Sequence, residues 1–375
     1  MRVLMVTNSY PDFPGSHRGL FIRKLCLHMN KQGVEIKVLT PRIHSRSPFT
    51  EHDEGITIHR FRFPSGNRPL NQLESIPVLP MAVYMITGLA GALQLAAQWK
   101  PHVIHGNWIL PTGLIAALAG RFLRIPVLNT ARGMDVRISE RQPLRALFGL
   151  AVRLSDMATV VSSSMRTRTC LEHASITPTG VDDAFFDVHP GRITKTILYT
   201  RSLERVYDAE TLIRAMPIVR ERVPEGRLII AGSGSQEVFL RTLARNTGPG
   251  DSITFLGLVP SDHIPALMEQ ASVFVSPALS DGTSIALMEA IAAGLIPVVT
   301  DIDANRPLIR NGMDGLLFEP GNEKDLAEKI ITAFSGAIPP GTLDIKRKEY
   351  RSRVSWRSVA GDFISLYKGF SQGRT

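Results

Sequence analysis

Short apolar runs alternate with amphipathic stretches along most of the chain. The first half opens with an apolar run at 2–7, a loop rich in Pro and Gly at 8–19, a helical pattern at about 20–32 and a second apolar run at 34–40. Short apolar runs bounded by turn residues are typical of buried strands. This opening therefore predicts a strand–helix–strand unit with parallel strands. The same pattern predicts further strands at 102–105, 126–130 and 158–162, and helices at about 79–98, 113–123 and 141–155.

The alternation starts again after His189-Pro190-Gly191, which predicts a second domain. It indicates strands at 196–200, 228–231, 252–256, 273–276, 296–300 and 314–318, and helices at 209–222, 261–270, 285–293, 323–335 and 346–370. We therefore expect an α/β protein with two Rossmann-like, doubly wound parallel-sheet domains facing each other across a cleft. The expected division is 1–190, 191–350 and a C-terminal helix at 351–375.

Ligands of open parallel sheets bind outside the carboxyl ends of the strands. The loops that follow the predicted strands are therefore the candidate site. They are 8–19, 105–113 and 131–135 in the first domain, and 201–207, 232–234 and 277–284 in the second.

Composition and charge narrow the class of partner. The chain has 375 residues, 44% hydrophobic, and two cysteines far apart, so it has no disulfide framework or metal site built on Cys. Residues 1–180 hold 21 Lys and Arg against 10 Asp and Glu, whereas residues 181–375 hold 22 against 24. The basic first half predicts an acidic partner such as anionic lipid or a phosphate-bearing substrate. No nucleic-acid motif or aromatic interleaving accompanies the charge, so we expect no nucleic acid.

An uncharged stretch at 75–99 is long enough to span a bilayer. Pro77, Pro80, Gln94 and Gln98 argue against a spanning segment, so we interpret it as a buried or membrane-touching helix. The apolar run at 2–7 is too short for a signal peptide and is interpreted as a strand. These features predict a cytoplasmic protein.

Two carboxylates stand out in the second domain. Asp281 and Glu289 are the charged residues between Gln270 and Thr300, and Glu289 lies on a predicted helix whose other residues are small or apolar. A carboxylate in such surroundings is costly unless it is paired. The ordinary alternative is a Glu that reaches water at the helix edge. The chain Gly282-Thr283-Ser284 precedes this helix, whose N-terminus can offer free N–H groups to an anion.

Cations follow a strand of the same domain. Arg201 and Arg205 can clamp a phosphate, although both are equally consistent with surface residues. Glu289 can accept two hydrogen bonds from a ribose diol, and Asp281 can accept from sugar hydroxyls. Phosphate and polyol together describe a nucleotide sugar. Gly234, in a Gly-Ser-Gly turn, is a weak signal on its own. The implied catalysis is electrostatic, with cations stabilising a departing diphosphate.

The sequence resembles a known family at these residues. SPALSDGTSIALMEAIAAGLIPVVTD at 276–301 and NGMDGLLFEPGNEKDLAEKI at 311–330 resemble the donor-binding half of retaining glycosyltransferases of family 4, also called group 1. The resemblance extends over nearly the whole chain. It implies the GT-B fold, with the helix at 351–375 packing back on the first domain, a UDP- or GDP-linked sugar as donor, and no metal ion or other cofactor.

The resemblance also assigns roles to individual residues. Those of the donor site are Asp281 with Gly282, Thr283 and Ser284 for the sugar and diphosphate, Glu289 for the ribose, and Gly19 and Gly234 in the loops beside the donor. Asp281 replaces the commoner Glu of the family. Arg201 matches the family's arginine, whereas the usual Lys is absent and Arg205 is the nearby cation. Arg132 stands where the family often has His, and we assign it with Arg201, Arg205 and Asp281 to catalysis.

The implied acceptor side contains His105, Asn107 and Asp135. The implied activity is a retaining, metal-independent transfer of a hexose to a glycan or lipid-linked saccharide, in cell-envelope polysaccharide or glycoconjugate synthesis. The basic first domain would dock on the inner face of the cell membrane. Three alternatives stay open. They are a UDP-sugar 2-epimerase of the same fold using His105 and Asp135, a non-catalytic sugar-nucleotide-binding protein, and a membrane-interaction protein built on 75–99.

Overall fold

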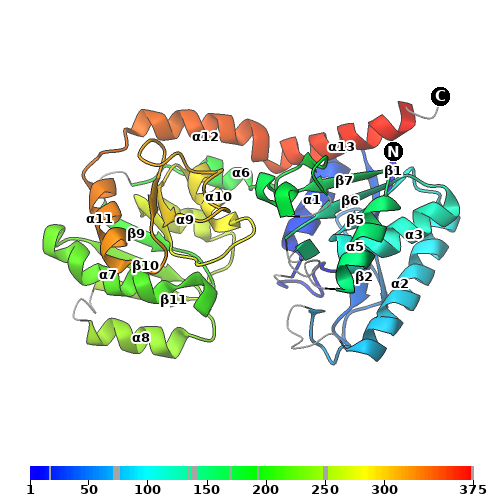
Figure 1. The fold of residues 1–375 in the computed structure, drawn as a ribbon, viewed down its shortest axis with the longest axis horizontal. Helices are drawn as coiled ribbons and strands as arrows, with labels where there is room; N and C mark the ends of the chain where they lie inside the picture. The colour runs from blue at the N-terminus through cyan, green and yellow to red at the C-terminus, as the bar shows by residue number, and fades with distance from the viewer. Residues whose placement is uncertain are drawn as a thin grey trace. The chain divides into compact units, whose positions relative to one another are not determined.

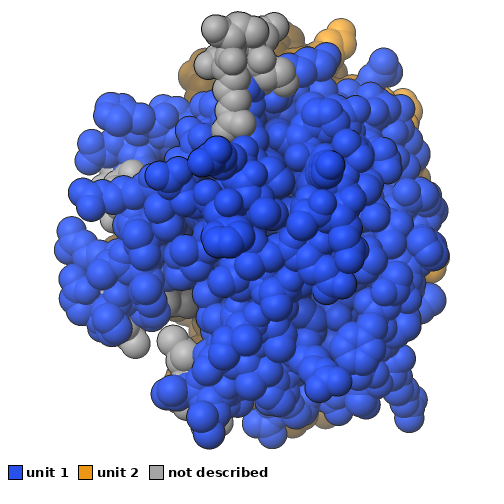
Figure 2. All heavy atoms as spheres, turned by 90° about the vertical axis from the view of Figure 1, so that its right-hand side faces the viewer, with its two compact units in different colours: residues 1–180, 356–375 blue, residues 181–355 orange. Residues whose placement is uncertain are grey.

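The computed structural model describes residues 1–16, 18–70, 77–133, 135–136, 142–168, 171–191, 194–247 and 252–372. The chain forms two compact units, Met1–Gly180 with Trp356–Thr375 (unit 1) and Val181–Ser355 (unit 2), which are coloured separately in Figure 2. The sequence placed the division near residue 190, but Phe185, Phe186 and Val188 are buried in a core cluster of unit 2. Because these apolar side chains pack in unit 2, the boundary between the units follows Gly180.

Unit 1 is a mixed sheet with helices on both faces (Figure 1). Its strands, in the order β3-β4-β2-β1-β5-β6-β7-β8, are β1 Arg2–Thr7, β2 Glu35–Arg42, β3 Thr50–Asp53, β4 Ile56–Arg62, β5 Val103–Asn107, β6 Val127–Ala131, β7 Met157–Val160 and β8 Ser175–Ile176. Its helices are α1 Leu20–Lys31, α2 Val78–Trp99, α3 Leu114–Leu123, α5 Leu144–Arg153 and α13 Trp356–Gln372, with short turns η2 Ile109–Gly113 and η3 Ser163–Arg168. Only β3 among these strands pairs in an antiparallel direction, with β4.

Strand β1 explains why the sheet is covered on both faces. Val3 and Met5 join a core cluster with α1 and α13, while Leu4 and Val6 join another with α2 and α3. Successive side chains of a strand point to opposite faces, so a continuous apolar run needs two apolar layers. The predicted doubly wound sheet with helices on both faces is confirmed for this unit, with β3 as an antiparallel strand at its edge.

The predicted helix at 346–370 is two helices in the structure, α12 Pro340–Val354 and α13, because Ser355 is extended. The two helices belong to different units, since Ser355 ends unit 2 and Trp356 begins the last part of unit 1. Phe363 and Tyr367 of α13 are buried in the cluster that α1 and β1 form. The C-terminal helix is therefore a core layer of unit 1.

We expect Phe363→Ala to lower the free energy of unfolding of unit 1 by about 3–5 kcal/mol, because a fully buried aromatic ring leaves a cavity. Hydrogen exchange of the β1 and α1 amides measures this change. The exposed Lys368→Ala on the same helix is the control and should stay within about 0.5 kcal/mol of the native protein. Equal effects of the two changes would show that α13 is not part of this core.

Unit 2 is a parallel sheet of six strands, β11-β10-β9-β12-β13-β14. The strands are β9 Thr196–Tyr199, β10 Arg227–Ala231, β11 Ile253–Gly257, β12 Val273–Ser276, β13 Ile296–Thr300 and β14 Leu316–Phe318. The helices are α6 Asp183–Phe186, α7 Ala209–Arg222, α8 Glu237–Asn246, α9 Ile264–Glu269, α10 Ile285–Ala293, α11 Glu323–Phe334 and α12, with the turn η4 Arg205–Tyr207. Two apolar clusters cover its two faces, which confirms the second doubly wound sheet.

Candidate functional site

The strand order of unit 2 reverses beside β9. The chain passes from β9 to β10 on one side, and β12 pairs with β9 on the other. Such a switch point opens a crevice at the carboxyl ends of the strands, where ligands of parallel sheets bind. The two loops that leave this point are 200–208, after β9, and 277–284, after β12. Both contain predicted donor-site residues.

The loop after β9 is fastened to its neighbours on both sides. The Leu203 N–H donates to the Ser233 carbonyl at 3.0 Å, and the Leu279 N–H donates to the Val206 carbonyl at 2.9 Å. Glu204 accepts from the N–H and the hydroxyl of Ser235 at 3.0 and 2.5 Å. The loops after β9, β10 and β12 therefore form one continuous rim in unit 2.

Gly234 belongs to this rim for a steric reason. A Cβ atom at this position would lie 2.5 Å from the Leu203 carbonyl oxygen and 2.8 Å from Glu204 Oε1. The loops can approach this closely only without a side chain there. Gly234 therefore supports the rim, and its direct contact with a donor stays a prediction.

Arg201 connects the two loops at the switch point. Its Nη1 lies 2.7 Å from Asp281 Oδ2 and donates a hydrogen bond to the Ser284 hydroxyl, and its guanidinium lies over the Tyr207 ring at 4.2 Å. The side chains of Arg201 and Asp281 are only 10% and 13% exposed. The structure thus brings together three of the predicted residues across about eighty positions of sequence.

The guanidinium of Arg201 stays protonated and therefore positively charged. Burial alone would lower the pKa of the guanidinium, but the Asp281 carboxylate offsets this and raises the pKa above its usual value. A permanently charged arginine with several N–H donors suits a diphosphate. Nη1 pairs with Asp281 and donates to Ser284. The other N–H groups of the same guanidinium can therefore donate to a phosphate oxygen.

The N-terminus of α10 lies beside this pair. The Ser284 hydroxyl accepts from the Leu287 N–H at 3.2 Å and caps the helix, and the Gly282 N–H donates to Asp281 Oδ1 at 2.8 Å. The Gly282 N–H is thus taken by Asp281 in this conformation rather than directed at a diphosphate. The first N–H groups of a helix have no partners within it. Those of Ile285 and Ala286 are the ones that the helix leaves to an anion.

Two hydroxyls near this helix end have no hydrogen-bond partner in the described part of the chain. They are Thr283 Oγ1 and Thr200 Oγ1, both buried atoms. Thr200 directly precedes Arg201, and Thr283 directly precedes Ser284. A buried polar atom without a partner is uncommon in proteins and is costly. This pair of hydroxyls therefore favours a polar ligand that completes their hydrogen bonding.

Glu289 lies on the accessible side of α10. Every other residue of the helix is buried except Ile285, which is four positions earlier and so on the same side. The carboxylate is half-buried and lies one turn from the helix N-terminus. Its predicted contact with a ribose stays a prediction, but its place on the one accessible side is consistent with it.

Arg205 is exposed and begins the turn η4. It lies on the same fastened loop as Arg201. No side-chain contact of Arg205 is described among the residues that the structure covers. Its assignment to the phosphate stays a prediction.

In unit 1, Gly19 starts α1 in the left-handed region, with φ of 68°, and a Cβ atom there would lie 2.5 Å from the Ser9 carbonyl group. The loop 8–19 is thus folded tightly against its own beginning. This close approach explains the glycine without a ligand, so its donor contact stays a prediction.

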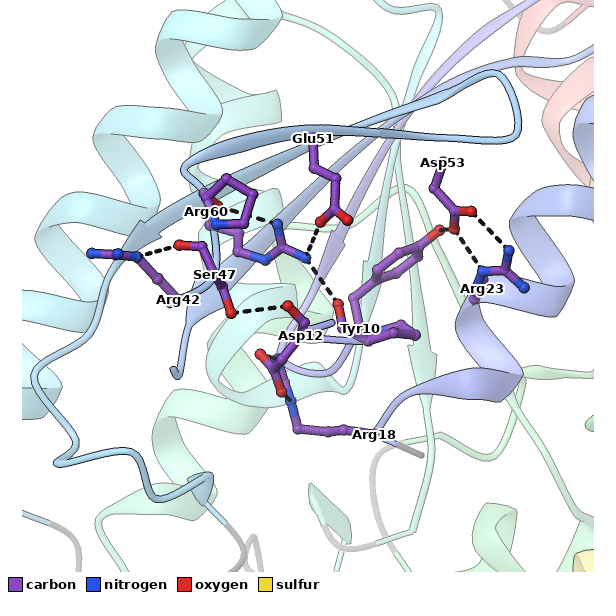
Figure 3. A network of polar contacts seen from close by, with 11 residues as sticks. Tyr10, Asp12, Arg18, Arg23, Arg42, Ser47, Glu51, Asp53 and Arg60 are labelled. Carbon is purple, nitrogen blue, oxygen red and sulfur yellow. Dashed lines mark hydrogen bonds and ion pairs between the residues drawn. The ribbon is translucent and has the colours of Figure 1, made fainter. Parts of the chain in front are cut away.

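The same loop is tied to the sheet edge by the polar network in Figure 3. Arg18 donates to both oxygens of the buried Asp12 at 2.6 and 2.8 Å, and the buried Arg60 donates to the Pro11 carbonyl at 2.9 Å and pairs with Glu51 at 2.7 Å. The loop after β1 is therefore held in one conformation by ion pairs.

Three predicted residues, Asn107 at the end of β5 and Arg132 and Asp135 after β6, form one cluster in unit 1. The Asn107 side-chain oxygen accepts from Arg132 Nε and Nη2 at 3.1 and 2.6 Å, and Asp135 accepts from the N–H groups of Ile109, Arg132 and Gly133. Arg132 also lies over the Phe21 ring at 5.1 Å, and burial lowers its pKa to about 10. The carboxylate of Asp135 thus shapes the loop that presents Arg132.

The three side chains assigned to the acceptor side are buried in unit 1. His105 and Asn107 have no exposed surface, and Asp135 is 2% exposed. His105 Nδ1 and Nε2 are hydrogen-bonded to Tyr367 and Thr130 at 2.5 and 2.7 Å. Burial, with the nearby charge of Arg132, lowers the pKa of His105 well below its usual value. The acceptor role of these three side chains stays a prediction, and Arg132 is the partly exposed member of the cluster.

Sequence reasoning missed several residues of the site. Glu204, Tyr207 and Thr200 lie at the rim around Arg201. No local pattern marks them, because Glu204 acts through a contact with another loop, Tyr207 through the placement of Arg201, and Thr200 through its burial. Their position just after a predicted strand was the one available signal.

Comparisons with known proteins identify the family of the chain. A family model described as glycosyl transferases group 1 matches residues 185–350, and one described as a glycosyl transferase 4-like domain matches residues 19–169. An uncharacterized glycosyltransferase of Methanocaldococcus jannaschii is 24% identical over 396 residues and covers 98% of each chain. The GDP-mannose-dependent alpha-(1-6)-phosphatidylinositol monomannoside mannosyltransferase of Mycobacterium tuberculosis is 25% identical over 408 residues and covers 100% of each chain.

Solved structures share the fold over the whole chain. A sucrose-phosphate synthase from Thermosynechococcus elongatus has a TM-score of 0.78 at 17% identity, covering 100% of each chain. HepE of Anabaena in complex with UDP-glucose has a TM-score of 0.71 at 17% identity, covering 98% of this chain and 100% of that one.

Proposed function

The chain belongs to the group 1 glycosyl transferases, has the GT-B fold and transfers sugar from a nucleotide sugar, and we propose that its donor site is the switch point of unit 2. The observation that carries this proposal is the junction of Arg201, Asp281 and the N-terminus of α10. A cation, a helix N-terminus and unpartnered hydroxyls meet there. This set matches a diphosphate joined to a polyol.

Each part of a nucleotide sugar has a matching group in unit 2. The diphosphate meets the guanidinium of Arg201 and the free N–H groups at the start of α10. The ribose hydroxyls donate to the Glu289 carboxylate, one turn further along the helix. The donor sugar hydroxyls meet Asp281 and the Thr283 hydroxyl.

The same groups explain the chemistry of transfer. The bond between the anomeric carbon and the diphosphate oxygen breaks, and negative charge grows on the departing diphosphate. Arg201, with Arg205 on the same loop and the positive end of α10, stabilises that charge. These cations supply the stabilisation without a metal ion. The new bond forms at the anomeric carbon with retained configuration, which the anomeric proton coupling in the product spectrum reports.

We infer that the transferred sugar is a hexose and that the acceptor is a glycan or lipid-linked saccharide in envelope or glycoconjugate synthesis. The names of similar proteins support this class, since they include a mannosyltransferase acting on a phosphatidylinositol monomannoside and a glycogen synthase. The basic charge of residues 1–180 supports a cytoplasmic protein that is peripheral on the inner membrane face.

A thermal-shift screen of UDP- and GDP-linked sugars tests the proposal. A true donor raises the melting temperature by mass action, and about a hundred times its Kd adds roughly 2.7 kcal/mol. The donor found in this way is then incubated with candidate glycans and lipid-linked saccharides. Release of nucleoside diphosphate that depends on the acceptor supports transfer. Donor binding without release under any acceptor would favour a sugar-nucleotide-binding protein, and conversion of the donor without an acceptor would favour an epimerase.

A further inference from the structure

Helix α2 has an apolar side turned away from the sheet. Its buried row has a spacing of four residues and consists of Tyr84, Gly88, Ala92 and Ala96. A second row with the same spacing is shifted by two positions, which places it about 200° around the helix axis. That outward row consists of Val78, Ala82, Ile86, Ala90 and Gln94. Outward rows of helices in soluble proteins are normally charged or polar. The mainly apolar composition of this row therefore indicates that it contacts a partner.

The outward side chains are well exposed. Val78 is 80% exposed, Leu79 is 79% exposed and Ile86 is 68% exposed. Within the described residues α2 is the helix that is long and apolar enough to cross a membrane, but it packs on β2, β4 and α3. A methyl group at Gly88 would lie 2.7 Å from Ile115 Cδ1 of α3. In the folded unit, therefore, the outward row of α2 and the neighbouring Leu79 are available to a partner.

Helices α3 and α5 extend the same surface. They lie in the layer that contains α2, and α3 packs against both other helices. Figure 2 views the molecule from the side on which α2 and α3 lie in Figure 1. Phe122 of α3 is 79% exposed, and Leu147 and Leu150 of α5 are 40% and 43% exposed. Apolar side chains thus project from three neighbouring helices.

The charged side chains of helices α2, α3 and α5 are all basic. The sequence has no Asp or Glu at 77–133 or at 142–155. Arg121 on α3, and Arg145 and Arg153 on α5, are exposed. Arginines beside exposed apolar side chains fit the interface of an anionic bilayer, where apolar tips enter the acyl boundary and guanidinium groups meet phosphates.

We propose that the outward sides of α2, α3 and α5, which we call the helical face, dock on an anionic lipid bilayer. The helical face consists of Val78, Leu79, Ile86, Phe122, Leu147, Leu150, Arg121, Arg145 and Arg153. A second copy of the chain fits less well, because two such faces would oppose arginines with no acid between them. This docking rests on the proposed peripheral membrane location and assigns it to one surface of unit 1, and it requires no donor or acceptor.

Flotation of the full-length protein with lipid vesicles tests the proposal at low salt. The protein should float with vesicles of phosphatidylcholine and phosphatidylglycerol, and much less with phosphatidylcholine alone. The triple variant Arg121→Gln, Arg145→Gln, Arg153→Gln should bind anionic vesicles about a hundredfold more weakly, since each cation near such a surface is worth about fivefold. Its matched control is Arg214→Gln, Arg222→Gln, Arg227→Gln in unit 2, which should bind like the native protein.

The apolar contribution is tested by Leu79→Ser, Ile86→Ser, Phe122→Ser. These side chains are exposed, so the fold should survive, and insertion into an anionic lipid monolayer should be lost. The matched control in unit 2 is Val238→Ser, Phe239→Ser, Leu258→Ser, whose native side chains are 81%, 45% and 65% exposed. Both helical-face variants should keep the thermal shift given by the donor, which separates this proposal from the donor site.

Four results would overturn the proposal. Equal binding to neutral and anionic vesicles would show that the charge of the lipid does not drive docking. Equal losses in the unit 2 controls would show that the helical face is not the docking surface. Resistance to extraction by alkaline carbonate would indicate a spanning α2 instead of surface docking. Absence of vesicle binding, with a native dimer that the apolar variant turns into a monomer, would assign the face to a second copy.

Discussion

Replacing Arg201 with alanine is expected to lower the rate of sugar transfer by about 10²–10³-fold, the usual cost of removing one preorganised charge stabiliser. Two effects act together in this variant. The cation that faces the departing diphosphate is lost, and Asp281, which is 13% exposed, is left as an unpaired carboxylate beside that diphosphate. Acceptor-dependent release of nucleoside diphosphate measures the loss.

The second effect can be separated from the first. The double variant Arg201→Ala, Asp281→Ala removes the unpaired carboxylate, so its donor affinity should recover part of what Arg201→Ala loses. Arg241→Ala is the matched control, because Arg241 also pairs with an acid, at 2.9 Å, and stacks on an aromatic ring, at 4.7 Å, elsewhere in unit 2. A loss in Arg241→Ala as large as in Arg201→Ala would remove Arg201 from the site.

Replacing Glu289 with alanine is expected to weaken donor binding by about 10–100-fold, because a carboxylate that accepts from a ribose makes charged hydrogen bonds. The fold should survive, since Glu289 is half-buried on the accessible side of α10. Calorimetric titration with the donor found by thermal shift measures the change. The exposed Glu328→Ala on α11 is the control and should leave the affinity unchanged. Native affinity in Glu289→Ala would exclude the ribose contact.

The doubly wound sheets were predictable because buried parallel strands require continuous apolar runs. The run at 2–7 serves two apolar layers, and this requirement is visible in the sequence. The break at Ser355 was not, because nothing in its neighbours stops a helix there. The chain is extended at Ser355, where it pairs with Val181. That pairing joins residues far apart in sequence.

Part of the candidate site was predictable from the sequence, because residues that follow the strands of a parallel sheet lie at the edge where ligands bind. Arg201 and Asp281 follow strands that meet at a switch point, and the structure pairs them. His105 shows the limit of this reasoning. Its place at the end of a predicted strand indicated a site residue, whereas its hydrogen bond to Tyr367, 262 positions later, could not be predicted from the sequence. That contact depends on the packing of α13 against β5, which joins distant parts of the chain.

The central claim is that the nucleotide sugar binds at the switch point of unit 2. The crystal structure of the protein with the nucleoside diphosphate of its donor tests it most directly. The account predicts the diphosphate at the N-terminus of α10, within hydrogen-bond distance of the Arg201 guanidinium, and the ribose on the Glu289 carboxylate. A nucleotide bound away from both side chains would contradict the account.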